Sequence, residues 1–321
     1  MTEDLLCVEN LKKYFNAQES AVIRSKSKVK AVDDISFTVK KGSVFALVGE
    51  SGCGKSTTAR LILKLIQPTG GKVYFEGKDL YSLSSSELVK TRRDIQMIFQ
   101  DPYSSLNPRW SVEQILSEPL DTHRIGTRAE RKEMVKDILE IVGLKEEDCQ
   151  KYPHEFSGGQ RQRIGIARAL ITHPKFVICD EPISALDVSI QAQIINLLKD
   201  LQKELNLTYL FITHDLRIVQ FLCDMVGVMY LGKIVEIGST EAIFKNPRHP
   251  YSQALFSAIP QPDPFKVKEE VTLEGDVPSP LNPPSGCRFH TRCQFAMPIC
   301  SEEEPLLKIV DENHKCACHL L

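Results

Sequence analysis

The chain has 321 residues, and its 40 Lys and Arg residues nearly balance 42 Asp and Glu residues, for a formal charge of -2. At roughly 150 residues per domain, this length predicts one large domain or two of ordinary size. The balanced charge gives no global positive field that would hold nucleic acid by its phosphates, so we expect no nucleic-acid partner. The first ten residues are acidic where a signal peptide would be basic, and no apolar run approaches the ~18 residues of a spanning helix. The sequence therefore predicts a soluble, cytoplasmic chain.

The N-terminal part of the chain reads as a small β layer. Residues 5–15 and 33–50 look like antiparallel strands with turn signals. Between them lies a polar stretch, 16–30, with four basic residues. We interpret this stretch as a solvated loop rather than as a contact with a membrane surface.

Three short, continuous and β-branched apolar runs predict strands that are buried on both faces of a parallel sheet. They are VFALV at 44–48, FVICD at 176–180 and YLFITHD at 209–215. Helical patterns, for example 85–93 and 190–205, lie between the first and last of them. The predicted fold class is therefore α/β, with helices that cover a mainly parallel sheet.

A glycine-rich loop follows the first of these strands and precedes the helical run TTARLILKLI at 57–66. The loop matches the pattern G-x-x-x-x-G-K-[ST] and reads Gly49, Glu50, Ser51, Gly52, Cys53, Gly54, Lys55, Ser56 and Thr57. Its glycines let backbone amides approach nucleotide phosphates, and the positive end of the following helix faces them. We expect Lys55 to reach the β and γ phosphates and Ser56 to join Mg²⁺, with the Cys53 thiol incidental. The motif predicts a P-loop NTPase core that binds ATP and Mg²⁺.

Two carboxylates, Asp180 and Glu181, follow the strand at 176–180, at the sheet edge where open α/β folds bind ligands. Asp180 is suited to holding Mg²⁺ through water. Glu181 would lie beside the γ phosphate and polarise an attacking water as general base. Taken alone, such a pair is more often a helix cap or an exposed turn, but the phosphate loop upstream favours the catalytic interpretation.

A second glycine motif precedes the helical run RQRIGIARALI, and it reads Phe156, Ser157, Gly158, Gly159 and Gln160. This motif is similar to the ABC signature LSGGQ. Together with the phosphate loop, it makes the sequence resemble the ATP-binding subunits of ABC transporters, and within them the oligopeptide/dipeptide permease group. A Ser hydroxyl and exposed amides at a helix start offer a second anion site. The resemblance implies that this motif completes a nucleotide site on a facing subunit.

The resemblance assigns roles to three further polar residues. Gln100 resembles the Q-loop glutamine, which senses Mg²⁺ and water. Asp187, in SALD, resembles the D-loop aspartate at the subunit boundary. His214, in ITHD, resembles the switch histidine, which contacts the γ phosphate and orients Glu181. Outside this context, Gln100 and His214 would read as ordinary residues at strand ends.

The resemblance also implies where the adenine ring stacks and how the domains divide. Phe15 aligns with the aromatic residue that stacks on adenine, and Tyr14 beside it is the alternative. The 56 residues between Gln100 and Ser157 suffice for a small helical subdomain at about 101–165.

The composition changes late in the chain. Residues 246–321 hold 11 of the 18 prolines and five of the ten cysteines. The segment PRHPYSQAL at 247–255 resembles the HPY segment that follows the ATPase core of peptide-permease subunits. We therefore expect an ABC-type ATPase domain at 1–245 and a small Cys/Pro-rich C-terminal domain at 246–321.

The last 35 residues contain a set of cysteines spaced C-x5-C-x6-C and then C-x-C. Four thiolates suit zinc or an iron-sulfur cluster, but this spacing matches neither the usual zinc knuckles nor ferredoxins, so it chooses neither. The pattern GCRFHTRC…C…ACHL resembles permease ATPases whose tail cysteines bind a [4Fe-4S] cluster. The resemblance implies a [4Fe-4S] cluster, with zinc as the alternative. Its ligands would be Cys287, Cys293, Cys300 and Cys318. On this match Cys316 is not a ligand. Three nearby histidines are possible zinc ligands, but we interpret them as non-ligands: His290, His314 and His319.

Taken together, the resemblance implies an ATPase that couples ATP hydrolysis at a head-to-tail dimer to the uptake of di- and oligopeptides. It implies as partners a second homologous ATPase subunit, two membrane-spanning permease subunits and, indirectly, an extracytoplasmic substrate-binding protein, with the chain peripheral at the cytoplasmic face of the cell membrane. The alternatives are a nickel importer of the same subfamily and a soluble ABC ATPase that remodels nucleic acid or ribosomes. The short helical segment, the single cassette and the HPY tail argue against the last of these.

Overall fold

The computed structural model describes residues 3–16, 28–258 and 275–321. Much of the polar stretch predicted as a loop at 16–30 therefore lies outside the described residues. The chain forms two compact units. The first unit comprises Met1–Glu3, Lys40–Ser43 and Ser82–Phe211, and the second comprises Asp4–Val39, Val44–Tyr81 and Ile212–Leu321. The predicted boundary at 245 falls inside the second unit and stays a prediction.

The first unit contains strands in the order β8-β7-β6. Its strands are β6 (Ile95–Ile98), β7 (Phe176–Asp180) and most of β8 (Thr208–Thr213). β6 pairs with β7 in parallel, with Ile98 opposite Cys179. Every residue of β7 is buried, as its continuous apolar run predicts.

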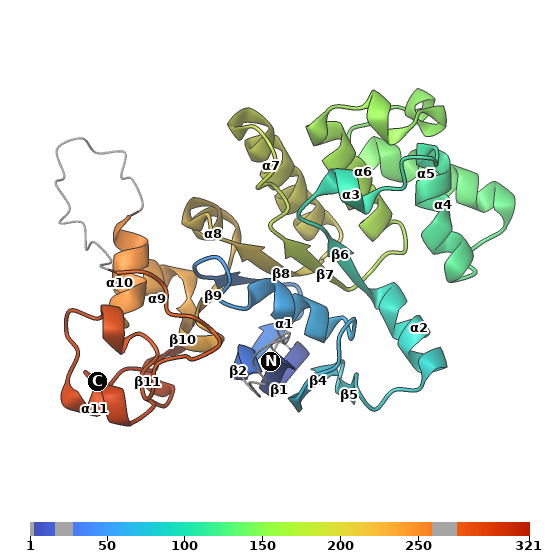
Figure 1. Ribbon diagram of the computed structural model, residues 1–321. Helices are drawn as coiled ribbons and strands as arrows, with labels where there is room; N and C mark the ends of the chain where they lie inside the picture. The colour runs from blue at the N-terminus through green and yellow to red at the C-terminus, as the bar shows by residue number, and fades with distance from the viewer. Residues whose placement is uncertain (1–2, 17–27, 259–274) are drawn as a thin grey trace, which may run out of the picture. The chain divides into compact units, whose positions relative to one another are not determined.

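The helices of the first unit begin at strong capping signals. Capping boxes at Ser111, Thr127 and Ser157 start three of the helices of the helical region (Figure 1), because each side-chain oxygen accepts from the amide three residues on. The helices are α2 (Ser85–Asp94), α3 (Pro102–Ser105), α4 (Val112–Thr122), α5 (Arg128–Ile141), η1 (Glu146–Gln150), η2 (Pro153–Glu155), α6 (Gly158–Leu170) and α7 (Val188–Glu204).

The second unit contains two groups of strands. One is a sheet of order β2-β1-β4-β5, in which β1 pairs antiparallel with β4. The other has the order β11-β12-β10-β9-β3, in which only β3 and β9 pair in parallel. The strands are β1 (Asp4–Asn16), β2 (Lys28–Lys40), β3 (Val44–Val48), β4 (Gly70–Phe75), β5 (Lys78–Asp79), β9 (Met225–Tyr230), β10 (Lys233–Ser239), β11 (Lys308–Asp311) and β12 (His314–Cys316).

The helices of the second unit are short, and none of the described helices of either unit is long and apolar enough to cross a membrane. The helices of the second unit are α1 (Lys55–Ile62), α8 (Leu216–Leu222), α9 (Thr240–Lys245), α10 (Pro250–Ser257), η3 (His290–Arg292) and α11 (Pro298–Glu302). α1 ends before the predicted limit at 66, because Lys64 adopts the left-handed conformation, with φ 50°. The α/β class, the parallel strands and the antiparallel N-terminal layer are confirmed.

Candidate functional site

The predicted site residues divide between the two units. The second unit carries the phosphate loop, His214 and the aromatic pair Tyr14 and Phe15. The first unit carries the remaining predicted residues: Gln100, Ser157, Gly158, Gly159, Gln160, Asp180, Glu181 and Asp187.

The phosphate loop connects β3 to α1, as its motif requires. Gly54 is the N-cap of α1, with φ 109° and no side chain to cap the helix. A Cβ atom at Gly54 would lie 2.1 Å from the carbonyl oxygen of Ala31, so only glycine fits there. Ser56 and Thr57 lie on the first turn of α1. Because Gly54 has no side chain, it cannot itself cap the first amides of α1, which is the arrangement of an anion site.

The Lys55 side chain turns back over the loop. Its ammonium donates to the carbonyl oxygens of Gly49 at 2.8 Å and Glu50 at 3.0 Å, and the residue is 5 % exposed. The Cys53 thiol lies 3.7 Å from the Lys55 ammonium, and burial raises the pKa of this thiol. A cation held over the loop by its own carbonyls is suited to meet anionic phosphate oxygens.

In the first unit, the structure brings Gln100 and Glu181 together. The Gln100 carboxamide donates a hydrogen bond of 2.9 Å to Glu181 Oε2. The pairing follows from the sheet: β6 and β7 are parallel neighbours, so the residues after their carboxyl ends meet at one edge. Asp180, the last residue of β7, is 5 % exposed. A glutamine and two carboxylates therefore share this edge, a donor set that suits Mg²⁺ and water.

Glu181 has an unusual backbone. Its φ is 46°, in the left-handed region that non-glycine residues seldom adopt. Its carbonyl oxygen accepts from the backbone N–H and the hydroxyl of Ser184, both at 3.2 Å. Such backbone geometry is concentrated at functional sites, where the surrounding structure holds it in place.

The signature motif lies at the start of α6. Ser157 Oγ accepts from the N–H of Gln160 at 3.4 Å, and the Gln160 side chain accepts from the N–H of Ser157 at 3.0 Å. Gly159 is packed so closely that a Cβ atom there would lie 2.5 Å from Ile190 Cγ2. Ser157, Gly158 and Gln160 are exposed. The motif therefore presents an exposed helix start that is capped by the Ser157 hydroxyl.

Asp187 and His214 are both exposed. Asp187 is the N-cap of α7, but its side chain accepts no capping hydrogen bond. His214 directly follows β8 and precedes Asp215, the N-cap of α8. A side-chain hydrogen bond from Arg217 is the main reason why the pKa of Asp215 is lowered. The roles predicted for Asp187 and His214 stay predictions.

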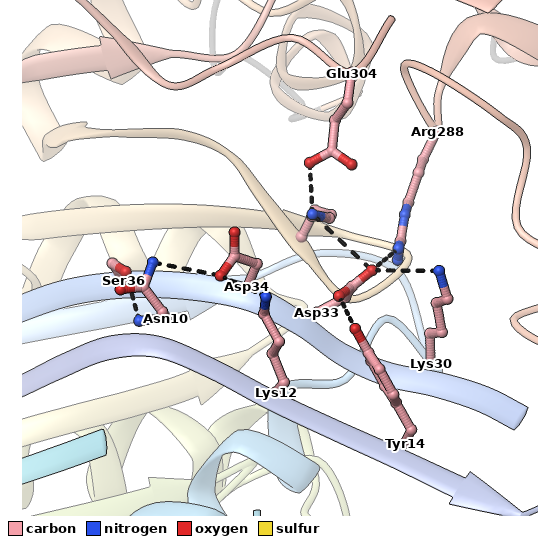
Figure 2. A network of polar contacts seen from close by, with 10 residues as sticks. Asn10, Lys12, Tyr14, Lys30, Asp33, Asp34, Ser36, Arg288 and Glu304 are labelled. Atoms are coloured by element: carbon pink, nitrogen blue, oxygen red, sulfur yellow. Dashed lines mark hydrogen bonds and ion pairs between the residues drawn. The ribbon is translucent and has the colours of Figure 1, made fainter. Parts of the chain in front are cut away.

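The two N-terminal aromatic residues have different surroundings. Phe15 is 39 % exposed, and the Lys13 ammonium lies 4.9 Å from the centre of its ring. Tyr14 instead donates its hydroxyl to Asp33 (Figure 2). Burial, followed by this hydrogen bond, raises the pKa of Tyr14 to about 12. Phe15 is thus the more accessible ring for stacking, while Tyr14 is engaged by Asp33.

Of the four predicted cluster ligands, Cys300 and Cys318 are buried, and Cys287 and Cys293 are half-buried. Burial, with smaller contributions from the charges of Cys300, Cys318 and Cys293, raises the pKa of Cys287 to about 11. The backbone N–H of Cys287 donates to the carbonyl oxygen of Cys300 at 2.8 Å. Among residues 3–16, 28–258 and 275–321, however, no group of three or more His, Cys, Asp or Glu is arranged to hold a metal ion. The geometry of the described residues does not support the predicted cluster.

Two contacts of the phosphate loop were not predicted from the sequence. Arg292 forms an ion pair with Glu50, and the Tyr251 hydroxyl accepts from the N–H of Glu50 at 2.9 Å. Both partners come from the part of the chain whose motifs were noted, the HPY segment and GCRFHTRC. These two motifs indicated a distinct C-terminal part, but they did not indicate that its residues contact the phosphate loop.

Comparison with known families and proteins agrees with these motifs. Residues 32–184 match the family described as ABC transporter, and residues 235–300 match the family described as oligopeptide/dipeptide transporter, C-terminal region. The chain is 51 % identical over 321 residues to the oligopeptide transport ATP-binding protein AppF of Bacillus subtilis (strain 168), covering 99 % of this chain and 98 % of the relative. It is 50 % identical over 320 residues to the probable peptide ABC transporter ATP-binding protein y4tS of Sinorhizobium fredii, covering 100 % and 91 %.

Solved structures show the same fold. One is a dimeric ATP-binding cassette in a post-hydrolysis state with ADP and Pi, which is 29 % identical with a TM-score of 0.65 and covers 73 % of this chain and 98 % of that one. Another is cbiO1 of Clostridium perfringens, part of an ABC transporter complex, which is 31 % identical with a TM-score of 0.65 and covers 76 % and 92 %.

Proposed function

Because this chain belongs to the ABC transporter family, we propose that it is the ATP-hydrolysing subunit of a peptide importer. The observation that carries the proposal is the hydrogen bond between Gln100 and Glu181 beside the buried Asp180, at the carboxyl edge of parallel strands. The C-terminal region typical of oligopeptide/dipeptide transporters and the full-length similarity to proteins named for peptide transport support peptides as the cargo.

ATP binding is assigned to the phosphate loop. The loop amides and the start of α1 bind the phosphates, and Lys55 neutralises the β and γ phosphates. Ser56, Asp180 and Gln100 would hold the Mg²⁺ that accompanies ATP and supplies charge neutralisation. The oxygen donors of these three side chains are of the type that Mg²⁺ prefers. Phe15, whose ring is exposed, stacks on the adenine.

Hydrolysis is assigned to Glu181. Its carboxylate takes a proton from the attacking water, so that the water oxygen becomes a better nucleophile toward the γ phosphorus. Gln100 holds Glu181 through its hydrogen bond and orients the carboxylate. His214 contacts the γ phosphate and orients the base.

The signature motif is assigned to the site of a second subunit. Ser157, Gly158 and Gln160 are exposed at the start of α6, which can take the γ phosphate of a nucleotide bound by a facing chain. Asp187 is exposed, and so is the neighbouring apolar residue Val188, at 78 %. These features favour a head-to-tail pair with a homologous ATPase, with each nucleotide between two chains.

The pair would bind two membrane-spanning permease subunits at the cytoplasmic face of the membrane, and an extracytoplasmic protein would deliver the substrate. We keep the division into an ATPase domain at 1–245, with a helical subdomain at about 101–165, and a C-terminal domain at 246–321. The names of the relatives favour peptides over nickel, and nothing in them favours a role on nucleic acid or ribosomes.

The four tail cysteines are assigned a structural [4Fe-4S] cluster, with zinc as the alternative. Support comes from the hydrogen bond of 2.8 Å between the backbones of Cys287 and Cys300, and from the small size of the tail, which has few aliphatic residues for a core of its own. The described geometry does not form such a site, so the assignment depends on metal analysis of the protein. No step of ATP hydrolysis is assigned to this group.

The test of the proposed function is transport. A strain that lacks this chain should lose uptake of a radiolabelled tripeptide, wild-type chain should restore it, and the Glu181→Gln variant should not. Normal peptide uptake in the deletion strain, with nickel uptake lost instead, would contradict the peptide assignment.

A further inference from the structure

The phosphate loop is held from outside by a charged side chain of the C-terminal part. Arg292 donates two hydrogen bonds to the Glu50 carboxylate, from Nη1 to Oε2 at 2.8 Å and from Nη2 to Oε1 at 3.2 Å. The Arg292 side chain is 6 % exposed and that of Glu50 is 25 % exposed. A bidentate pair fixes the orientation of both planar groups, and partial burial protects it from screening by salt.

The backbone of the same loop residue is held as well. The Tyr251 hydroxyl accepts from the N–H of Glu50 at 2.9 Å, and Tyr251 is fully buried. Arg292 Nη1 also donates to the Tyr230 hydroxyl at 3.4 Å. Glu50 is thus fixed through both its side chain and its amide, and the partners come from α10 and η3.

The residues that hold Glu50 rest on a packed aromatic cluster. The ring centres of Tyr230 and Tyr251 are 4.7 Å apart, and Phe289 lies 5.3 Å from Tyr230 and 5.4 Å from Tyr251. His249 lies 5.7 Å from Phe289, and its Nδ1 accepts from the N–H of Tyr251 at 3.1 Å. All four residues are almost fully buried. Rings packed in this way have few alternative rotamers, so the Tyr251 hydroxyl has a fixed position.

A second arginine anchors the same segment to the N-terminal strands. Arg288 donates to the Asp33 carboxylate and to the carbonyl oxygen of Leu231. Figure 2 shows Asp33 between Arg288, Lys30 and Tyr14. Although burial acts to raise it, the pKa of Asp33 is lowered by the hydrogen bond from Tyr14 and by the charges of Lys233 and Arg288. Asp33 is therefore a charged anchor, and the segment 287–293 is tied down at Arg288 as well as at Arg292.

We propose that Arg292 and Tyr251 are positioning residues of the nucleotide site, which hold the phosphate loop at Glu50 in the shape that binds ATP. The inference rests on the proposed function, since it takes the loop to be the ATP site. Through these two contacts, the folding of the C-terminal segment determines the affinity for nucleotide.

The physical reason is that phosphate binding depends on several loop amides that must point to one place. A displacement of about 1 Å in such a site is enough to cost a large factor in function. Neither Arg292 nor Tyr251 carries a proposed catalytic role. Their loss should therefore weaken binding and raise the KM for ATP, while turnover at saturating ATP stays near that of the wild type.

The experiment measures binding of a fluorescent ATP analogue with Mg²⁺ to the full chain. Arg292→Gln should raise the Kd about tenfold, and Tyr251→Phe, which removes one hydroxyl, about threefold. Arg292→Lys keeps the charge but cannot form the bidentate pair, so it should recover only part of the affinity. Because Glu50 and Arg292 act as a pair, the double variant with Glu50→Gln and Arg292→Gln should bind the ATP analogue about as weakly as either single variant.

Arg248→Gln is the matched control. It removes another ion pair of the C-terminal part, 2.9 Å to Asp311, which does not involve the loop, and it should leave the Kd unchanged. Wild-type Kd values in both Arg292→Gln and Tyr251→Phe would overturn the inference, as would an equal loss of affinity in Arg248→Gln. If Arg292→Gln fails to fold, Tyr251→Phe alone decides. A wild-type chain that binds no nucleotide would overturn the proposed function, and the inference with it.

Discussion

The carboxamide of Gln100 and the carboxylate of Glu181 are joined by a hydrogen bond of 2.9 Å, although 81 positions separate them in the sequence. Each residue follows the carboxyl end of a strand, and the two strands are parallel neighbours. The contact fixes the direction of the carboxylate that we assign as general base. The orientation of Glu181 therefore depends on a residue outside its own strand.

Replacing Gln100 with Ala should lower kcat about tenfold to a hundredfold, because the base loses its orienting donor. The affinity for Mg-ATP should fall by a smaller factor, about threefold, because Ser56 and Asp180 still hold the Mg²⁺. Steady-state ATPase assays with a separate nucleotide-binding measurement check this. Gln96→Ala is the matched control, since Gln96 lies on β6, the strand that precedes Gln100, and its carboxamide donates to the Arg92 carbonyl oxygen at 2.7 Å and not to Glu181. Equal kcat values in the Gln100 and Gln96 variants would contradict the role.

A comparison of two serines distinguishes the role of Ser157 in the signature motif from its role as a helix cap. Ser157 and Ser84 each start a helix with a capping box in which Oγ accepts an amide at 3.4 Å. Replacing either serine with Ala should lower the free energy of unfolding by about 1 kcal/mol. Only Ser157→Ala should also impair ATP-dependent dimerisation in the presence of the homologous ATPase, as measured by light scattering. Normal dimerisation of Ser157→Ala would argue against a signature that completes the facing site.

Acid should destabilise the second unit through His249. Burial lowers the pKa of His249 to about 4, and its Nδ1 accepts the N–H of Tyr251, which requires the neutral ring. The unfolded chain has the higher pKa and binds the proton more readily, so stability is lost as the pH falls below about 6.5 toward 4. The loss attributable to this group between pH 7.5 and 5 is about 2 kcal/mol. Urea unfolding at several pH values checks this, and His249→Asn should flatten that part of the profile; an unchanged slope would refute it.

Protein purified without oxygen should be brown and contain about four irons and four sulfides per chain, if the tail cysteines bind the proposed cluster. Replacing Cys287, Cys293, Cys300 and Cys318 with Ser should remove the colour and lower stability, whereas Cys316→Ser should keep the colour. Colourless protein with one zinc per chain would show that the cysteines bind zinc instead of the cluster. Colourless, metal-free protein of full stability would agree with the described geometry and end the metal assignment.

The local patterns of the sequence predicted the buried strands well. Continuous apolar runs predicted the limits of the strands 44–48 and 176–180 as the structure has them, because a strand buried on both faces is apolar along its length; in the second strand the exception is Asp180, the site carboxylate at its end. The predicted strand at 209–215 is β8, which begins one residue earlier and ends two earlier, where polar residues start. The end of α1 was harder, since the left-handed Lys64 has no composition signal.

The contacts between distant parts of the chain could not be predicted. Arg292 and Glu50 are 242 positions apart, and Arg288 and Asp33 are 255 apart. Nothing local in either member indicates its partner, because arginines and acidic residues are common on protein surfaces. Only the folded chain shows that the C-terminal segment reaches the phosphate loop.

The most direct test of the central claim, that this chain hydrolyses ATP with Glu181 as the base, is the ATPase rate of Glu181→Gln together with its affinity for ATP. The change replaces one oxygen by an amide nitrogen and leaves the phosphate loop untouched. We predict a loss of about a thousandfold in kcat with the Kd for ATP within about twofold of wild type, because an amide cannot accept the proton of the attacking water. Equal ATPase rates in the wild type and in Glu181→Gln would contradict the account.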